Sequence, residues 1–129
     1  MPPRSPLEDP DHLRLLLQLP CLASGETPAG AYAHIHYPSA LLSKPVTGTG
    51  MLPEDKWAVP LKAWFHTVSR NPDAPGGEEG WWERRGINPL VVATRLHAAS
   101  VTLRDAGVSE AEIVKRLTAI IIAARACAC

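Results

Sequence analysis

Three histidines and one aspartate stand at positions from which they can perform metal-assisted acid–base chemistry. His34 and His36 alternate with apolar residues in a strand-like segment, Asp55 ends a long Gly- and Pro-rich stretch, and His66 follows a second strand-like run. Imidazole nitrogens and carboxylate oxygens bind divalent metal ions, and a neutral imidazole can take a proton from water. These residue types therefore indicate hydrolytic chemistry. Partly buried or surface histidines without a chemical role are the alternative interpretation of the same spacing.

Two short strands and a helix are expected to position these side chains. Residues 31–37 alternate in polarity as a half-buried strand does, which places His34 and His36 on one face. Residues 57–61 predict a second strand, and residues 62–69 predict a helix that continues from it. A long loop rich in proline and glycine connects the two strands, and loops of this length are uncommon unless they are functional or disordered.

Further helices are expected on both sides of this unit. One begins at Asp11, its N-cap, and is stopped by Pro20. Residues 78–85 predict a second helix, and the rest of the chain is helical. The last helix begins with a capping box in which Ser109 is the N-cap and Glu112 the N3 residue. Its apolar face needs a partner surface and consists of Ile113, Leu117, Ile120 and Ile121.

Length and charge limit the classes of protein to which the chain can belong. With 129 residues, of which 46% are hydrophobic, it is long enough for one modest core. Thirteen basic residues balance thirteen acidic ones, so the chain lacks the overall positive charge of many nucleic-acid-binding proteins. Any contact with DNA must therefore be local.

Cysteine content and hydropathy indicate the compartment. The three cysteines, Cys21, Cys127 and Cys129, do not form a recognisable disulfide framework, which favours a reducing environment. No run approaches the roughly 20 apolar residues of a membrane span, and the N-terminus lacks the apolar core of a signal peptide. We expect a cytoplasmic protein that does not contact membranes.

The remaining aromatic and histidine residues are assigned structural roles. The four tryptophans are expected to anchor the core, because the chain contains only one phenylalanine: Trp57, Trp64, Trp81 and Trp82. His12 and His97 lie on predicted helices away from the candidate site, and both are expected to be solvated.

An ordered series of short motifs runs through residues 13–100. It comprises Leu19-Pro-Cys21, Gly25, Ala33-His-Ile35, Thr49-Gly-Met51, Pro53-Glu-Asp55-Lys-Trp-Ala-Val-Pro-Leu61, His66, Glu79 with Trp81-Trp82, and Gly86-Ile-Asn-Pro89. The series resembles the small phage and prophage HNH-type nuclease family, which is related to the RecA-dependent nuclease Ref. The resemblance implies an α+β protein with a small ββα-metal (HNH-like) core and additional N- and C-terminal helices.

The resemblance also implies roles for individual residues. His34 matches the general base on the first strand. Asp55 matches the acidic residue before the second strand, where its role is either to hold the metal or to orient His34. His66 matches the histidine that begins the helix and binds the metal. The implied cofactor is one divalent ion, Mg²⁺ or Mn²⁺, with Zn²⁺ as a further candidate. The implied reaction is hydrolysis of a phosphodiester bond in DNA.

The chain departs from the family pattern at two ligand sets. The family has two Cys-x-x-Cys pairs that hold a structural zinc, but Ser24, Lys62 and Phe65 replace three of the four cysteines and only Cys21 remains. One thiolate cannot hold a tetrahedral zinc, so we expect no structural zinc, with Phe65 and Trp64 filling the space.

A further family histidine, downstream of His66, also has no counterpart. One of four residues would have to replace it as a metal ligand: His36, Asn71, Asp73 or Glu78. Of these we assign the role to His36.

Three functions remain open from the sequence. The first is a metal-dependent endonuclease or nickase that acts on DNA for a phage, in the cytoplasm of its host. The second is a degenerate member of the family that binds DNA or a protein partner without cutting. The third is a helical module that forms homo-oligomers. The expected organisation is a disordered lead (1–11), the nuclease-like domain (12–100) and a C-terminal helix (101–129) packed on the domain or on a partner.

Overall fold

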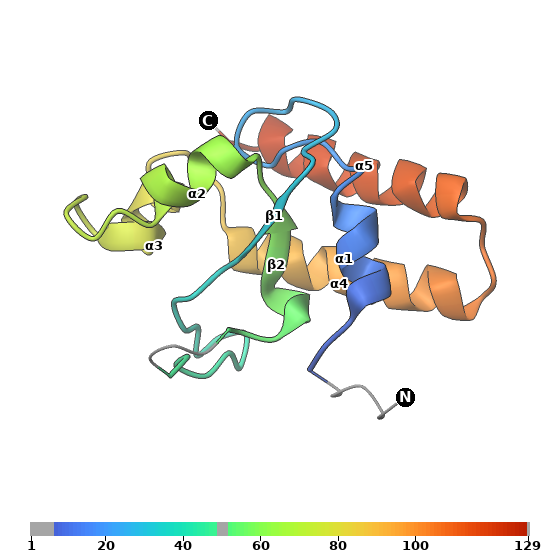
Figure 1. Ribbon diagram of the computed structural model, residues 1–129, viewed down its shortest axis with the longest axis horizontal. Helices are drawn as coiled ribbons and strands as arrows, with labels where there is room; N and C mark the ends of the chain where they lie inside the picture. Colours follow the sequence, from blue (N-terminus) through green and yellow to red (C-terminus); the bar gives the residue numbers. More distant parts are fainter. Residues whose placement is uncertain (1–6, 49–51, 129) are drawn as a thin grey trace.

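The computed structural model describes residues 7–48 and 52–128 (Figure 1). In chain order its elements are α1 (Pro10–Leu16), β1 (Tyr32–His34), the 3₁₀ turn η1 (Asp55–Trp57), β2 (Ala58–Pro60), α2 (Ala63–Ser69), α3 (Gly77–Glu83), α4 (Pro89–Asp105) and α5 (Glu110–Ala126). The described residues thus form five α-helices and one two-stranded antiparallel sheet, which confirms the expected α+β class.

The two strands form a short antiparallel pair. His34 lies opposite Ala58 and Ala33 lies opposite Val59, and the pairing continues for one residue where Ile35 N–H donates to the carbonyl of Trp57 at 3.0 Å. This register brings the end of β1 beside η1, the turn that precedes β2. Beyond His34 the chain soon leaves β2, because the N–H of His36 donates to the Glu78 carboxylate at 2.8 Å. The strand is therefore shorter than the predicted 31–37.

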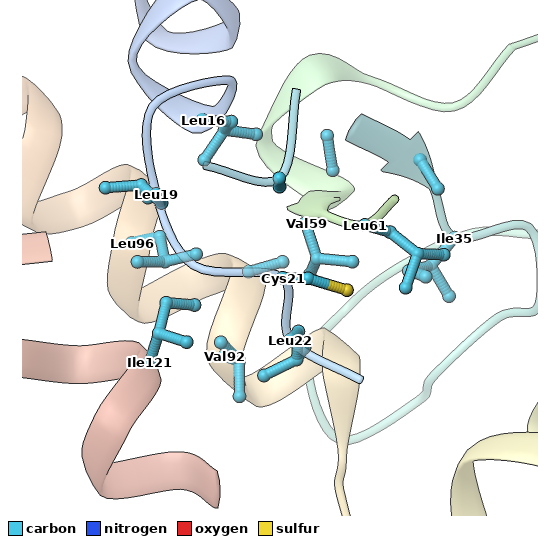
Figure 2. Packing of buried hydrophobic residues seen from close by; sticks show 14 of the residues in the cluster. Leu16, Leu19, Cys21, Leu22, Ile35, Val59, Leu61, Val92, Leu96 and Ile121 are labelled. Carbon is cyan, nitrogen blue, oxygen red and sulfur yellow. The ribbon is translucent and has the colours of Figure 1, made fainter. Parts of the chain in front are cut away.

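The core lies between the sheet, the segment from α1 to Leu22 and the hairpin formed by α4 and α5. Figure 1 shows α4 and α5 side by side and running in opposite directions, with α4 adjacent to β2 and η1. Figure 2 shows how the core side chains converge from these elements. The labelled residues are Leu16, Leu19, Cys21, Leu22, Ile35, Val59, Leu61, Val92, Leu96 and Ile121, all of them buried.

Side-chain caps determine where the two long helices begin. The Asn88 side chain accepts hydrogen bonds from the N–H groups of Leu90 and Val91, and Pro89 occupies the first turn of α4. At α5 the Ser109 hydroxyl accepts from the N–H of Glu112, which confirms the predicted N-cap. The Glu112 carboxylate pairs with Arg116 at 3.1 Å, one turn further along the helix.

The boundaries of the predicted segments differ from the structure at both ends. The first helix is capped by Asp9 and not by Asp11, and residues 7–11, which were expected in the disordered lead, are bonded to the fold. Residues 1–6 of that lead and the motif at residues 49–51 lie outside the described residues. At the other end α4 continues to Asp105, so the predicted boundary at residue 101 falls inside this helix.

Three of the four tryptophans are core residues, as expected. Trp57, Trp81 and Trp82 are buried, but the side chain of Trp64 is 75% exposed, so the prediction for this residue was wrong. The reason is the orientation of α2: the neighbouring Phe65 faces the core, with its ring 5.9 Å from that of Trp81. Among the described residues, no helix has the length and apolar character needed to cross a bilayer.

The apolar face of α5 is covered within the chain. Ile113, Leu117 and Ile121 are buried and Ile120 is partly buried, and α5 packs along α4. The alternative in which this face binds a second copy is therefore not needed to explain its composition.

Replacing Leu117 with alanine tests this packing. Because the side chain is fully buried, we expect Leu117→Ala to lower the free energy of unfolding by about 2–5 kcal/mol, measured by chemical denaturation. Ile122→Ala is the matched control, since Ile122 is on the same helix and is 59% exposed; its effect should stay within about 0.5 kcal/mol. Equal losses in the two variants would contradict the observed orientation of α5.

Candidate functional site

The structure brings His34 and Asp55 together. His34 Nε2 lies 2.9 Å from Asp55 Oδ1, although the two residues are 21 positions apart in the chain. His34 is the last residue of β1 and Asp55 the first of η1, so the antiparallel register places both at the same end of the sheet. Their side chains are 10% and 13% exposed. The two residues predicted to be catalytic thus form one hydrogen-bonded pair.

This hydrogen bond determines which nitrogen of His34 is available for chemistry. A carboxylate oxygen can only accept, so a neutral His34 bonded to Asp55 carries its hydrogen on Nε2. The lone pair is then on Nδ1, which has no hydrogen-bond partner among residues 7–48 and 52–128. Such an imidazole can take a proton at Nδ1 while the Asp55 carboxylate stabilises the resulting positive charge.

The Asp55 carboxylate is held from a second side by the chain that precedes α1. The N–H of Asp9 donates to Asp55 Oδ2 at 2.6 Å, and the N–H of Asp55 donates to the carbonyl of Leu7 at 3.0 Å. The Asp9 carboxylate in turn accepts two hydrogen bonds from Arg104, at 2.9 and 2.6 Å, and one from His97 at 3.1 Å.

The charge on Asp9 is stabilised by these partners. Partial burial raises the pKa of Asp9, but the hydrogen bonds from Arg104, from the N–H of His12 and from His97, together with the positive charge of Arg104, outweigh burial and lower it to about 2. Asp9 lies 88 residues from His97 and 95 residues from Arg104 in the chain, so the sequence contains no local signal for this cluster.

The expectation of a solvated side chain was wrong for His12, whereas the side chain of His97 is partly exposed, at 26%. His12 is fully buried, its ring meets that of His97 edge-on at 4.9 Å, and neither of its nitrogens has a hydrogen-bond partner in the described part of the chain. Burial, with His97 beside it, lowers the pKa of His12 to about 4. The available signal was its spacing: His12 lies three and four residues before Leu15 and Leu16, on the apolar face of α1.

His36 and His66, the two predicted metal ligands, are not joined to this pair. No hydrogen bond or ion pair connects the side chain of either residue to the side chain of His34 or Asp55 within the described residues. His66 Nε2 lies 3.2 Å from the carbonyl oxygen of Leu61, and the residue lines a groove of about 860 Å³ along α2.

His36 belongs to a separate polar cluster. Its N–H donates to Glu78, and its carbonyl accepts a hydrogen bond from Lys44 Nζ at 3.3 Å. Burial and the positive charge of Arg70 lower the pKa of His36, and burial raises the pKa of Glu78. A neutral His36 is a competent ligand, but no acidic or histidine side chain in the described chain completes a set of three around it.

The metal site that the family resemblance implies is therefore not assembled. Among residues 7–48 and 52–128, no three histidine, cysteine, aspartate or glutamate side chains gather closely enough to hold one ion. Three protein ligands with an open position are usual for a catalytic zinc, and magnesium needs one or two carboxylates and several waters. Within the described residues, the candidate site offers the His34–Asp55 pair without a third metal-ligating side chain.

The region around Cys21 and the start of α2 is closed by packing and hydrogen bonds. Cys21 is buried, and its Sγ accepts a hydrogen bond from the N–H of Lys62 at 3.4 Å. Cys21 thus lies against the start of α2. Phe65 packs inward here, whereas Trp64 does not fill the space.

The buried His12 predicts a pH-dependent stability. Its pKa falls from an ordinary value of 6.5 to about 4 on folding, so the unfolded chain binds the proton more tightly. The free energy of unfolding should decrease as the pH falls from about 6.5 to about 4, by on the order of 3 kcal/mol, whereas Asp9 contributes only below its ordinary value of 3.8. Denaturant titrations of His12→Leu should show a much smaller decrease, because only His36, whose pKa burial also lowers, still contributes to it, and those of His66→Leu should retain the full decrease. The same decrease in both variants would contradict the assignment to His12.

The surroundings of Cys21 predict the metal content of the purified chain. Because the Cys21 thiol is paired with a backbone N–H, and Ser24, Lys62 and Phe65 stand where the resembling family has its other three cysteines, we expect less than one tightly held zinc per purified chain. EDTA should change the melting temperature little. Elemental analysis that returns one chelator-resistant zinc per chain would contradict this expectation.

Comparison of the chain with protein-family models, with curated proteins and with solved structures finds no match. The features of the chain that bear on function are therefore the geometry of the His34–Asp55 pair and the sequence motifs around it.

Proposed function

We propose that this protein hydrolyses phosphodiester bonds in DNA as an HNH-type endonuclease or nickase, with His34 as the general base. The observation that carries the proposal is the 2.9 Å hydrogen bond between His34 Nε2 and Asp55 Oδ1. The bond unites the two residues to which the motif resemblance gives catalytic roles. It also leaves the imidazole in the tautomer that a base needs.

The order of the elements supports the same proposal. An antiparallel pair with a long connection, β1 and β2, is followed after two residues by the helix α2. The ββα-metal fold that the resemblance implies has a hairpin that carries the general base, a long connecting loop and a helix that supplies metal ligands. Cys21 lies against the start of α2, which is the place of the zinc-binding turn in the resembling family.

The residues supply the first half of a hydrolytic reaction. His34 Nδ1 takes a proton from water, and Asp55 stabilises the imidazolium that forms. The water oxygen attacks phosphorus, and the P–O bond to the leaving oxygen breaks. The leaving oxygen departs with the bonding electron pair and takes a proton from solvent water. A bound divalent ion would supply stabilisation of the leaving oxygen, but His36 and His66 are not joined to the pair, so the residues present do not fit that ion.

This misfit favours a second candidate, a family member that binds DNA or a protein partner without cutting. The specific observations are the absence of a three-ligand group among the described residues and the small exposed fractions of His34 and Asp55. In this candidate the pair stabilises the end of the sheet. The third function, a homo-oligomer formed through α5, has no such support, because Leu117 and its neighbours pack within the chain.

A plasmid-nicking assay with Mg²⁺, Mn²⁺ or Zn²⁺ separates the two candidates. We expect His34→Ala to retain the fold and to reduce nicking by about 10²–10⁴-fold, the usual loss when a general base is removed. His66→Ala should increase the Mn²⁺ concentration needed for half-maximal nicking. His36→Ala should have a smaller effect than His34→Ala unless His36 binds the ion.

The outcomes that contradict the proposal are specific. Equal and small effects of the three substitutions would show that another site or a contaminant cuts the plasmid. A parent protein that nicks with none of the three ions, but shifts labelled DNA in a gel, would establish the non-cutting candidate.

A further inference from the structure

We propose that Asp9 is a positioning residue of the candidate site. Its backbone N–H holds the carboxylate of Asp55 in place. Its own carboxylate is bound by side chains of α4 and holds that backbone in place. The inference rests on the proposed function only in taking the His34–Asp55 pair as the site. It concerns a segment that ordinary sequence signals assign to a disordered lead.

The segment before α1 binds Asp55 at two points. The N–H of Asp9 donates to Asp55 Oδ2 at 2.6 Å, and the carbonyl of Leu7 accepts from the N–H of Asp55 at 3.0 Å. Because His34 already occupies Oδ1, both carboxylate oxygens and the main chain of Asp55 have partners. The segment therefore determines the plane of the Asp55 carboxylate. It thereby also determines the direction from which this carboxylate holds His34.

The segment is itself fixed by α4. Arg104 donates to both oxygens of the Asp9 carboxylate, at 2.9 and 2.6 Å, in the two-point geometry that is stronger and more directional than a single contact. His97 adds a third bond at 3.1 Å. Arg104 is held in turn by the carbonyl and hydroxyl of Ser100, one helical turn earlier.

These contacts form one continuous series from α4 to the base. It runs from Ser100 to Arg104, then through the Asp9 carboxylate and the Asp9 N–H to Asp55, and ends at His34 Nε2. Side chains of Asp9 and Arg104 are 21% and 25% exposed, so solvent weakens the ion pair less than it would on the surface.

Asp11 shows by contrast why Asp9 has this role. Asp11 is two residues further along the same chain segment, but its carboxylate pairs with Arg14 on the exposed face of α1 at 3.4 Å. Removing its charge leaves every contact of Asp55 in place. Asp11→Asn is therefore the matched control.

Two variants separate positioning from simple helix capping. Asp9→Ser keeps a good N-cap for α1 but removes the partner of Arg104. Arg104→Gln is far from the cap and removes the two-point contact from the other side. If Asp9 positions the site, both variants should loosen the Asp55–His34 bond, and Arg104→Lys should restore it in part.

The primary readout is the tautomer of His34, measured by long-range ¹H–¹⁵N NMR of the full chain at a pH where its imidazole is neutral. We expect the parent and Asp11→Asn to show the Nε2–H tautomer, and Asp9→Ser and Arg104→Gln to show a mixture. In a nicking assay both variants should lose up to about 10²-fold in kcat with little change in KM, because the base is displaced while DNA contacts remain.

The two readouts keep the inference separate from the proposed function. An inactive parent with the expected tautomer changes would refute the nuclease and support the positioning role. An unchanged His34 tautomer in both variants would overturn the positioning role, whatever happens to the melting temperature. If Asp9→Ser fails to fold, the comparison of Arg104→Gln with Arg104→Lys still decides the matter.

Discussion

The partly buried negative charge of Asp9 is the constraint on which the arrangement around the sheet depends. A carboxylate withdrawn from water needs compensating partners, and here they come from two helices: Arg104 and His97 on α4, and the N–H of His12 on α1. The same residue donates its own N–H to Asp55 beside the strands. One residue thus connects the N-terminus of α1, the helix α4 and the turn η1 that precedes β2.

The sheet needs this support because it is very small. Each strand has three residues, and an isolated two-stranded ribbon is marginally stable in water. Burial of Val59 and Ile35 against α4 and the N-terminal segment contributes the apolar stabilisation, and the polar contacts of Asp55 hold the end of the sheet in register. The candidate site lies at that end, so its geometry is a property of the whole fold and not of the two strands alone.

Local patterns in the sequence predicted the elements well, and contacts between distant residues escaped them. Three features could be predicted because their causes lie within a few residues. They are the cap at Ser109, the strand alternation before His36 and the helix after Leu61. The motif resemblance, and not the residue spacing, indicated His34 and Asp55 as site residues. A long loop separates the two residues, and no spacing rule relates residues that an antiparallel strand pair brings together across such a loop. The Asp9 cluster joins residues that are 88 and 95 positions apart, and nothing near Asp9 distinguishes it from Asp11. The exposure of Trp64 and His12 differs from the expected one because position on the helix face, and not residue type, determines whether these side chains are buried.

The long reach of the Asp9–Arg104 contact has a consequence for the order in which the molecule matures. During synthesis the strands and the turn with Asp55 leave the ribosome well before residue 104, and closing so long a loop is the slow, late part of folding. A nascent or C-terminally shortened chain that lacks the end of α4 has His34 and Asp55 in its sequence but lacks Arg104, the two-point partner of Asp9. The observed geometry of the pair should therefore be complete only after residue 104 has been made and α4 has packed, which separates the translation of the strands from the completion of the candidate site.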